Sequence, residues 1–192
     1  LADDLKHQHF SEHAQCLALL GGFLDKATGA GLAKSLASSE NISRTTIYFT
    51  HYLFETYKTL DLPALFFERL KLWSSLDEHG FKTTFEEPEP SRSDCHAWGA
   101  HPLFHCYATI LGIRPDAPGF RSVRIAPMPG DLKKVSGTMP HPKGEIAVSL
   151  EIGPGCSLSA NVKLPAGVKG VFEWRGIEKK LNPGKNIIRF KG

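Results

Sequence analysis

The periodicity of this 192-residue chain changes near Gly112. Before this glycine, apolar residues recur at the three- and four-residue intervals that are typical of amphipathic helices. After it, short alternating runs such as GEIAVSLEI and SLSANVKL are separated by glycine and proline, which is the pattern of short strands. The sequence therefore predicts a helical domain over residues 1–112 and a β-domain over residues 113–192.

Charge and composition change at the same place. Residues 1–112 carry nine basic and 14 acidic side chains, whereas residues 113–192 carry 14 basic and six acidic ones. Eight of the nine histidines lie in the first part and nine of the 13 prolines in the second. The basic residues of the second part are scattered and lack interleaved aromatics, so we expect no nucleic-acid partner. No apolar run is long enough for a membrane span, and LADDLKHQHF has no signal-peptide pattern.

Five helices are predicted in the first part. Ser11 is expected to cap a helix over 12–26 with Gly29 as its stop signal, and Pro102 to kink the last helix or start a new turn within it. That last helix is expected to pack a set of large apolar residues, namely Trp98, Leu103, Phe104, Tyr107 and Leu111. The further helices are expected at about 30–38, from Asn41 or Ser43 to Leu60, at 63–77 and at 94–111. Broad apolar faces and short links favour an array of αα-hairpins.

The second part predicts a small antiparallel β-sandwich. In GEIAVSLEI every second residue is apolar, from Ile146 to Ile152, and the same holds from Leu158 to Leu164. Two further strands are expected at VFEW and NIIRF.

An acidic run, TTFEEPEPSRSDCHAW, joins two of the predicted helices. Pro88 favours an extended backbone at Glu87, and alternation along an extended run places Phe85 and Glu87 on one side and Glu86 on the other. The residues alone leave two interpretations open. The run is either a solvated polar loop or a rigid segment that holds one carboxylate for chemistry.

Histidine and cysteine spacing argues against a metal centre. His96, His101 and His105 lie at positions i, i+5 and i+9, whereas zinc ligands on one face of a helix are usually spaced i, i+3 or i, i+4. No CxxC pair is present. We therefore predict no metal and no organic cofactor. Three cysteines lie in apolar helical patterns and are expected to pack as small hydrophobic residues. His96 itself has two interpretations, as a ligand contact or as a buried histidine that bonds to backbone.

The runs TTFEEPEPSRSDCHAWGAHPLF, SEHAQCLALLGGFL and TIYFTHYLFETY resemble the last helices of the catalytic barrel of glycoside hydrolase family 78 α-L-rhamnosidases. The segment from GIRPDAPGF to GEIAVSLEI is similar to the family's C-terminal β-domain. The resemblance implies the final part of an (α/α)6 barrel followed by a β-sandwich, in an inverting enzyme that removes terminal α-L-rhamnose. It also implies a periplasmic or extracellular location.

The resemblance further implies roles for individual residues. The family's general base closes a Thr-Thr-x-x-Glu run, which here ends at Glu87, while Glu86 stands where the family usually has a bulky residue. The substrate-contacting histidine falls on His96, and Trp98 or Phe85 would line the sugar pocket, with core packing as the stronger interpretation of Trp98. No motif here matches the general acid, which would belong to the upstream remainder of the same barrel.

Three functions stay open at this point. The first is part of a rhamnosidase that acts on rhamnose-containing glycosides or polysaccharides. The second is a non-catalytic sugar-binding or structural fragment. The third is another (α/α)6 glycosidase with a different sugar specificity.

Overall fold

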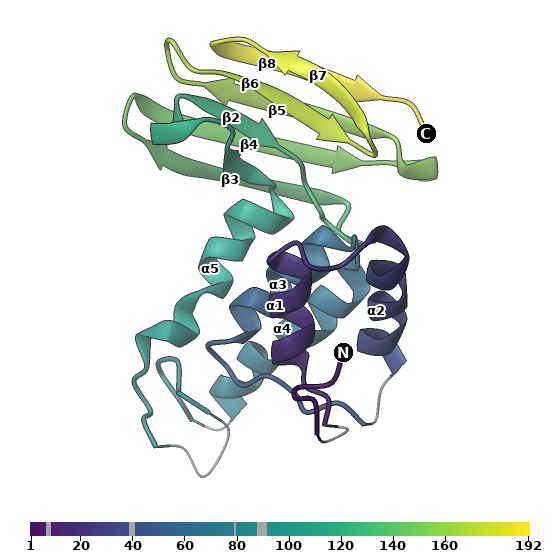
Figure 1. Cartoon of the computed structure of the whole chain (residues 1–192). Coiled ribbons are helices and arrows are strands. Elements are labelled where there is room, and N and C mark those ends of the chain that lie inside the picture. The colour runs from purple at the N-terminus through teal and green to yellow at the C-terminus, as the bar shows by residue number, and fades with distance from the viewer. Residues whose placement is uncertain (7–8, 39–40, 79, 88–91) are drawn as a thin grey trace. The chain divides into compact units, whose positions relative to one another are not determined.

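The computed structural model describes residues 1–6, 9–38, 41–78, 80–87 and 92–192. The chain divides into two compact units, Leu1–Pro102 and Leu103–Gly192. The composition change at Gly112 lies ten residues after this division. The first unit is helical and the second contains two four-stranded sheets, as the sequence predicts (Figure 1). None of the described helices combines the length and apolar character needed to cross a bilayer.

Four α-helices form the first unit, α1 (Glu12–Leu20), α2 (Lys26–Ser38), α3 (Thr50–Thr59) and α4 (Pro63–Glu78), followed by a 3-10 turn, η1 (Ala97–Ala100). Helix α1 packs against α2 and α3, and α3 packs against α4. Phe54 of α3 and Phe66 of α4 are fully buried with their ring centroids 4.5 Å apart. This pair forms the centre of the apolar contact between the two helices.

The predicted boundary between the first two helices is wrong. Helix α1 ends at Leu20 instead of residue 26, because Gly22 adopts a φ of +73°, a backbone conformation that closes helices. Gly29, the predicted stop signal, lies inside α2.

Helix α3 begins at Thr50, several residues later than predicted. Ser43 instead bridges to Ser11, and the buried carboxylate of Glu12 accepts a hydrogen bond of 2.7 Å from the backbone N–H of Thr45. Arg44 forms an ion pair of 2.7 Å with the same carboxylate. These contacts hold the segment before α3 in a non-helical conformation.

The residues of the predicted last helix form three short helical turns, and Pro102 starts the second of them. These are the 3-10 turn η1, a single α-turn, α5 (Pro102–His105), and a π-helical turn, η2 (Cys106–Ile110). The expectation that Trp98, Leu103 and Phe104 are packed in the core is wrong, because their exposed fractions are 66%, 68% and 49%.

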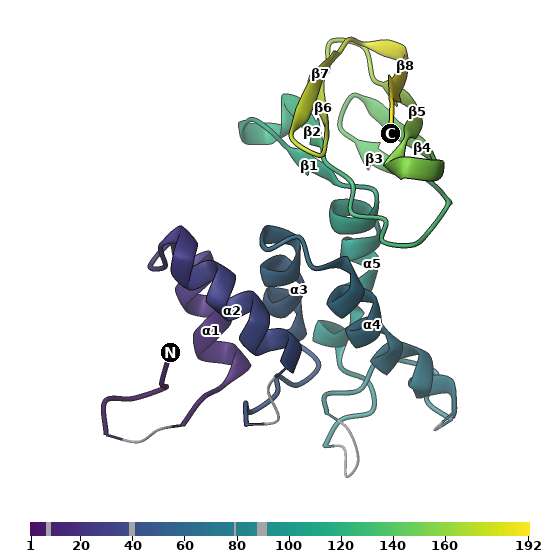
Figure 2. The same ribbon diagram turned by 90° about the vertical axis from the view of Figure 1, so that its right-hand side faces the viewer.

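The second unit is a β-sandwich, whose two layers are seen in Figure 2. One sheet has the order β1-β2-β6-β7, and the other β3-β4-β5-β8. The strands are β1 (Ile113–Pro115), β2 (Ser122–Ile125), β3 (Lys134–His141), β4 (Gly144–Ile152), β5 (Leu158–Leu164), β6 (Lys169–Trp174), β7 (Ile177–Leu181) and β8 (Gly184–Phe190); 3-10 turns η3 (Pro118–Phe120) and η4 (Pro154–Cys156) lie between them.

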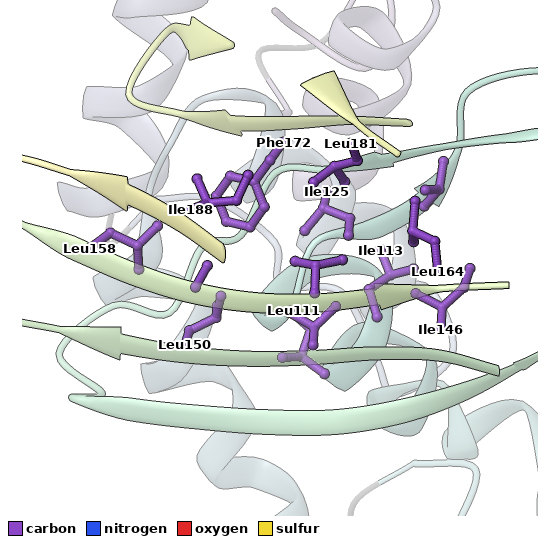
Figure 3. Close-up of a cluster of buried hydrophobic side chains, with 14 of the residues drawn as sticks. Leu111, Ile113, Ile125, Ile146, Leu150, Leu158, Leu164, Phe172, Leu181 and Ile188 are labelled. Carbon is purple, nitrogen blue, oxygen red and sulfur yellow. The ribbon is translucent and has the colours of Figure 1, made fainter. Parts of the chain in front are cut away.

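The predicted alternation of β4 and β5 is confirmed. Ile146 and Leu150 of β4, and Leu158 and Leu164 of β5, are buried and face the other sheet (Figure 3). Their neighbours in sequence face outward. The predicted antiparallel sandwich is confirmed, with one exception within it: β2 and β6 run parallel, with Val123 opposite Gly170.

Candidate functional site

The acidic run of the first unit folds back on the residues that follow it. The backbone N–H of Glu86 donates to the carbonyl of Ser93 over 2.9 Å, and that of His96 donates to the carbonyl of Thr84 over 2.7 Å. The hydroxyl of Thr84 donates in turn to the carbonyl of His96 over 2.7 Å. Residues 83–87 and 92–96 therefore form a paired structure, which we call the acidic hairpin. His96 is extended instead of helical, with φ −121° and ψ 102°.

The two described glutamates of the acidic hairpin have different surroundings. Arg92 donates to both carboxylate oxygens of Glu86, whose side chain is only 19% exposed. These hydrogen bonds, together with the positive charge of Arg92, hold the pKa of Glu86 below its ordinary value despite partial desolvation. The Glu87 carboxylate lies 3.9 Å from Nε of Arg92 and is 40% exposed. Glu86 is thus held in an ion pair, and Glu87 is the more accessible acid.

Pro88, which was expected to hold Glu87 in an extended backbone, lies outside the described residues. Its predicted effect on Glu87 stays a prediction. Phe85 is buried, with 4% of its surface exposed, and its ring centroid lies 5.0 Å from that of Phe81. Phe85 is therefore packed against Phe81 in the segment after α4, and its expected contact with a sugar stays a prediction.

Three rings lie next to one another beside the acidic hairpin, and Trp98 is the middle one. The rings of His96 and Trp98 lie nearly perpendicular, with their centroids 5.6 Å apart. The ring of Tyr48 also contacts Trp98, at a centroid distance of 5.3 Å. Trp98 is 66% exposed and Tyr48 is 42% exposed. Large exposed rings beside polar groups are suited to contact the apolar face of a sugar ring. The site thus offers an accessible carboxylate, an imidazole and an aromatic surface on one helical unit.

Gly99 fixes the turn that carries Trp98. A Cβ at this position would lie 2.8 Å from Cβ of Thr84 and 3.0 Å from Cγ2 of Ile47, closer than side chains tolerate. The Trp73 indole donates a hydrogen bond of 2.7 Å to the carbonyl of Gly99. The acidic hairpin and the η1 turn are therefore packed against each other and against α4.

Sequence reasoning missed three residues of this site, namely Tyr48, Arg92 and Gly99. Arg92 carries a readable signal, since it is the basic residue closest in sequence after three glutamates. Tyr48 gives no comparable signal, because its aromatic ring was indistinguishable from the apolar face of a helix. The close approach at Gly99 depends on Thr84 and Ile47 and is invisible without the fold.

A known protein family matches most of the β-unit. Residues 112–184 match the family model described as the bacterial alpha-L-rhamnosidase C-terminal domain. No curated protein matches the sequence of the chain.

Solved structures of rhamnosidases share the fold of nearly the whole chain. The family 78 rhamnosidase of Bacillus sp. GL1 matches with a TM-score of 0.78 and 25% identity, over 88% of this chain and 19% of its own. The α-L-rhamnosidase of Aspergillus terreus matches with a TM-score of 0.78 and 18% identity, over 92% of this chain and 23% of its own. The Streptomyces avermitilis enzyme, solved with L-rhamnose, matches with a TM-score of 0.70 and 16% identity, over 93% and 21%.

The chain spans about a fifth of the length of these enzymes. Its β-unit matches the family model, and both units follow the rhamnosidase fold. Residues 112–184 therefore match the C-terminal domain of bacterial α-L-rhamnosidases, and the chain as a whole resembles the C-terminal region of glycoside hydrolase family 78 α-L-rhamnosidases.

Proposed function

We propose that this chain supplies part of the active site of an inverting α-L-rhamnosidase, with Glu87 as the general base. Residues 1–112 are the closing helices of the catalytic barrel, and residues 113–192 are its C-terminal β-domain. The observation that carries the proposal is the difference between the two glutamates. Arg92 holds Glu86 in an ion pair and leaves Glu87 the more accessible acid.

An inverting glycosidase needs a carboxylate that removes a proton from water while the water attacks the anomeric carbon. A second carboxyl group protonates the leaving oxygen, and the two lie about 6.5–9.5 Å apart to leave room for the water. Glu86 is unsuited to be the base, since a carboxylate stabilised by Arg92 is a weaker proton acceptor. The general acid is assigned to barrel helices outside these residues.

His96 and the rings beside it bind the sugar in this proposal. The His96 imidazole can donate or accept a hydrogen bond with a rhamnose hydroxyl, and Trp98 is exposed for contact with the apolar face of the ring. In this proposal Phe85 contributes by packing on Phe81, which helps to hold the acidic hairpin in place. The L-rhamnose complex of the Streptomyces avermitilis relative supports rhamnose as the sugar.

A chimera tests the base assignment. This chain replaces the matched C-terminal region of the Bacillus sp. GL1 enzyme, and hydrolysis of an aryl rhamnoside is measured. Glu87→Gln is expected to lower kcat by about 10²–10⁴-fold, the usual effect of losing a general base. The matched control Glu86→Gln is expected to change kcat by only a few-fold. Equal kcat values for the Glu87→Gln and unmodified chimeras would overturn the assignment.

The isolated 192-residue chain separates catalysis from sugar binding. It is expected to hydrolyse no aryl rhamnoside, because the proposal places the general acid elsewhere. Calorimetric binding of L-rhamnose, together with a fully active Glu87→Gln chimera, would favour a non-catalytic sugar-binding role for this region.

A further inference from the structure

The outward face of the β3-β4-β5-β8 sheet contains a cavity of about 600 Å³. Binding sites for small molecules usually have volumes of about 300–1,000 Å³. The cavity lies on the side of the sheet away from the sandwich core, since Ile146 and Leu150 of β4 face inward and Ala147 and Ser149 face outward. It therefore opens to solvent and takes no part in core packing.

Strand register explains why the face is hollow. The outward residues form two rows across the four strands, in which the β3 and β4 side chains are small and the β5 and β8 side chains are mostly long. The first row is Thr138, Ala147, Lys163 and Lys185, and the second is Ser136, Ser149, Asn161 and Ile187. The small side chains form the floor of the cavity, and the long ones form its wall.

Two lysines lie directly opposite each other in this wall. Lys163 of β5 pairs in register with Lys185 of β8, an arrangement in which like charges destabilise a sheet. Near the cavity the sheet does compensate a lysine, because Lys134 forms an ion pair of 3.0 Å with Glu151, its cross-strand partner. Neither Lys163 nor Lys185 has such a pair with an acid in the described part of the chain. An anion bound between the two ammonium groups would remove their repulsion.

The remaining lining specifies the kind of anion. Asn161 and the hydroxyls of Ser136, Thr138 and Ser149 offer both donors and acceptors, as a ligand rich in hydroxyl groups requires. The lining residues of the cavity include no aromatic ring for stacking on a neutral sugar or on a base. They include no arginine either, so an anion bound here would meet the ammonium groups of lysines as point charges and not a bidentate guanidinium.

We propose that this cavity binds a carboxylate-bearing oligosaccharide, a short stretch of acidic glycan, with its carboxylate between Lys163 and Lys185. The choice of a sugar acid over other anions rests on the proposed glycosidase function. The cavity would hold an acidic polysaccharide to the β-domain, in addition to the sugar bound near Glu87.

Calorimetry on the 192-residue chain tests the proposal with a galacturonate trimer as the probe. The trimer is expected to bind at least about tenfold more tightly than a neutral galactose trimer, and binding is expected to weaken as salt is added. The double variant Lys163→Gln, Lys185→Gln is expected to weaken binding about tenfold or more. Its matched control, Lys169→Gln with Lys180→Gln, removes the same charge from the other sheet and is expected to leave binding unchanged.

A variant without a charge change tests the cavity itself. Ser149→Phe places a ring on the floor and is expected to abolish binding, while thermal melting confirms that the variant is folded. Equal loss in the Lys169/Lys180 control, equal binding of the neutral trimer, or equal competition by inorganic phosphate would each overturn the proposal, as would absence of binding. Glu87→Gln is expected to bind the trimer normally, so failure of the base assignment and failure of this proposal are separable.

Discussion

The guanidinium of Arg92 holds the carboxylate of Glu86 through two hydrogen bonds, one of them 3.1 Å long from Nε. The ion pair connects residues on the two sides of the acidic hairpin. It gives the two neighbouring acids different surroundings, since the carboxylate of Glu87 lies 3.9 Å from Nε of Arg92.

The first prediction concerns the titration of Glu86. Because Arg92 stabilises the charged form, the pKa of Glu86 is lower than that of an ordinary glutamate. Arg92→Gln is expected to raise this pKa toward the ordinary value, as measured by carboxyl carbon NMR. The ion pair stabilises the fold above the unfolded-state pKa and is lost as pH falls through the folded-state value. An unchanged Glu86 titration in the variant would contradict the ion pair.

A second prediction compares the same substitution at two glycines. Gly99→Ala is expected to destabilise the chain by about 1–3 kcal/mol, because the new Cβ meets Thr84 at 2.8 Å and Ile47 at 3.0 Å. Gly31→Ala, inside α2 with no atom within 4 Å, is expected to stabilise it by about 0.5–1 kcal/mol. Urea unfolding measures both. Opposite signs are the expected result, and equal values would show that the packing at Gly99 is loose.

The third prediction is a pH dependence from His101. Burial lowers the pKa of His101 below 6.5. A hydrogen bond of 2.9 Å between its Nε2 and the carbonyl of Ile47 raises this pKa but does not offset the effect of burial. The unfolded chain therefore binds a proton at higher pH than the folded chain does. The contribution of neutral His101 to the stability of the fold is fully present above pH 6.5. It is lost as pH falls from there toward the folded-state pKa.

Thermal melting between pH 7.5 and 5 checks this dependence, with His101→Gln as the comparison. The unmodified chain is expected to lose more stability across this interval than the variant does. Identical slopes for the two proteins would show that another group is responsible.

A fourth prediction concerns thiol reactivity. Cys16 is fully buried, and desolvation raises its pKa to about 11, whereas Cys95, Cys106 and Cys156 are exposed. Iodoacetamide is therefore expected to label three thiols of the folded chain and the fourth only after denaturation. Rapid labelling of Cys16, detected by peptide mass spectrometry, would indicate that α1 opens readily. Of the three cysteines that the sequence predicted to be packed in the interior, Cys16 is buried and the other two are exposed.

The fifth prediction concerns the effect of the Lys163–Lys185 pair on the stability of the fold. Lys185→Glu places opposite charges on β5 and β8 and is expected to stabilise the chain by about 0.2–1 kcal/mol, less at high salt. Lys180→Glu serves as the control, because its partner in register is the uncharged Val171. A gain of the same size in both variants would trace the effect to net charge instead of to the pair.

The sequence predicted the β-unit better than the helical one. Alternation from Ile146 to Leu150 and from Leu158 to Leu164 determines which face is buried, since a strand with one buried face has a single acceptable register. The start of α3 depends on tertiary contacts, among them the carboxylate of Glu12 on the backbone of Thr45. Such contacts join residues 33 positions apart and leave no local pattern.

The candidate site shows the same division. The run of glutamates, with His96 and Trp98 after it, was visible in the sequence, and the resemblance to family 78 singled out Glu87. The environment of each acid was not visible, because it depends on which side chain Arg92 reaches. Trp98 was expected in the core and is exposed, since an isolated aromatic residue in a short turn has no periodicity to indicate its direction.

The parallel pairing of β2 with β6 has a consequence for how the chain is made. A ribosome releases β2 and β1 early, and these two strands can pair at once. The other edge of β2 must wait until residues 169–172 have been added, because β6 supplies its partner. In the interval the strands β3, β4 and β5 can form from neighbouring segments. The newly made sandwich therefore carries an open strand edge during synthesis, which is the state most exposed to mispairing with another nascent copy.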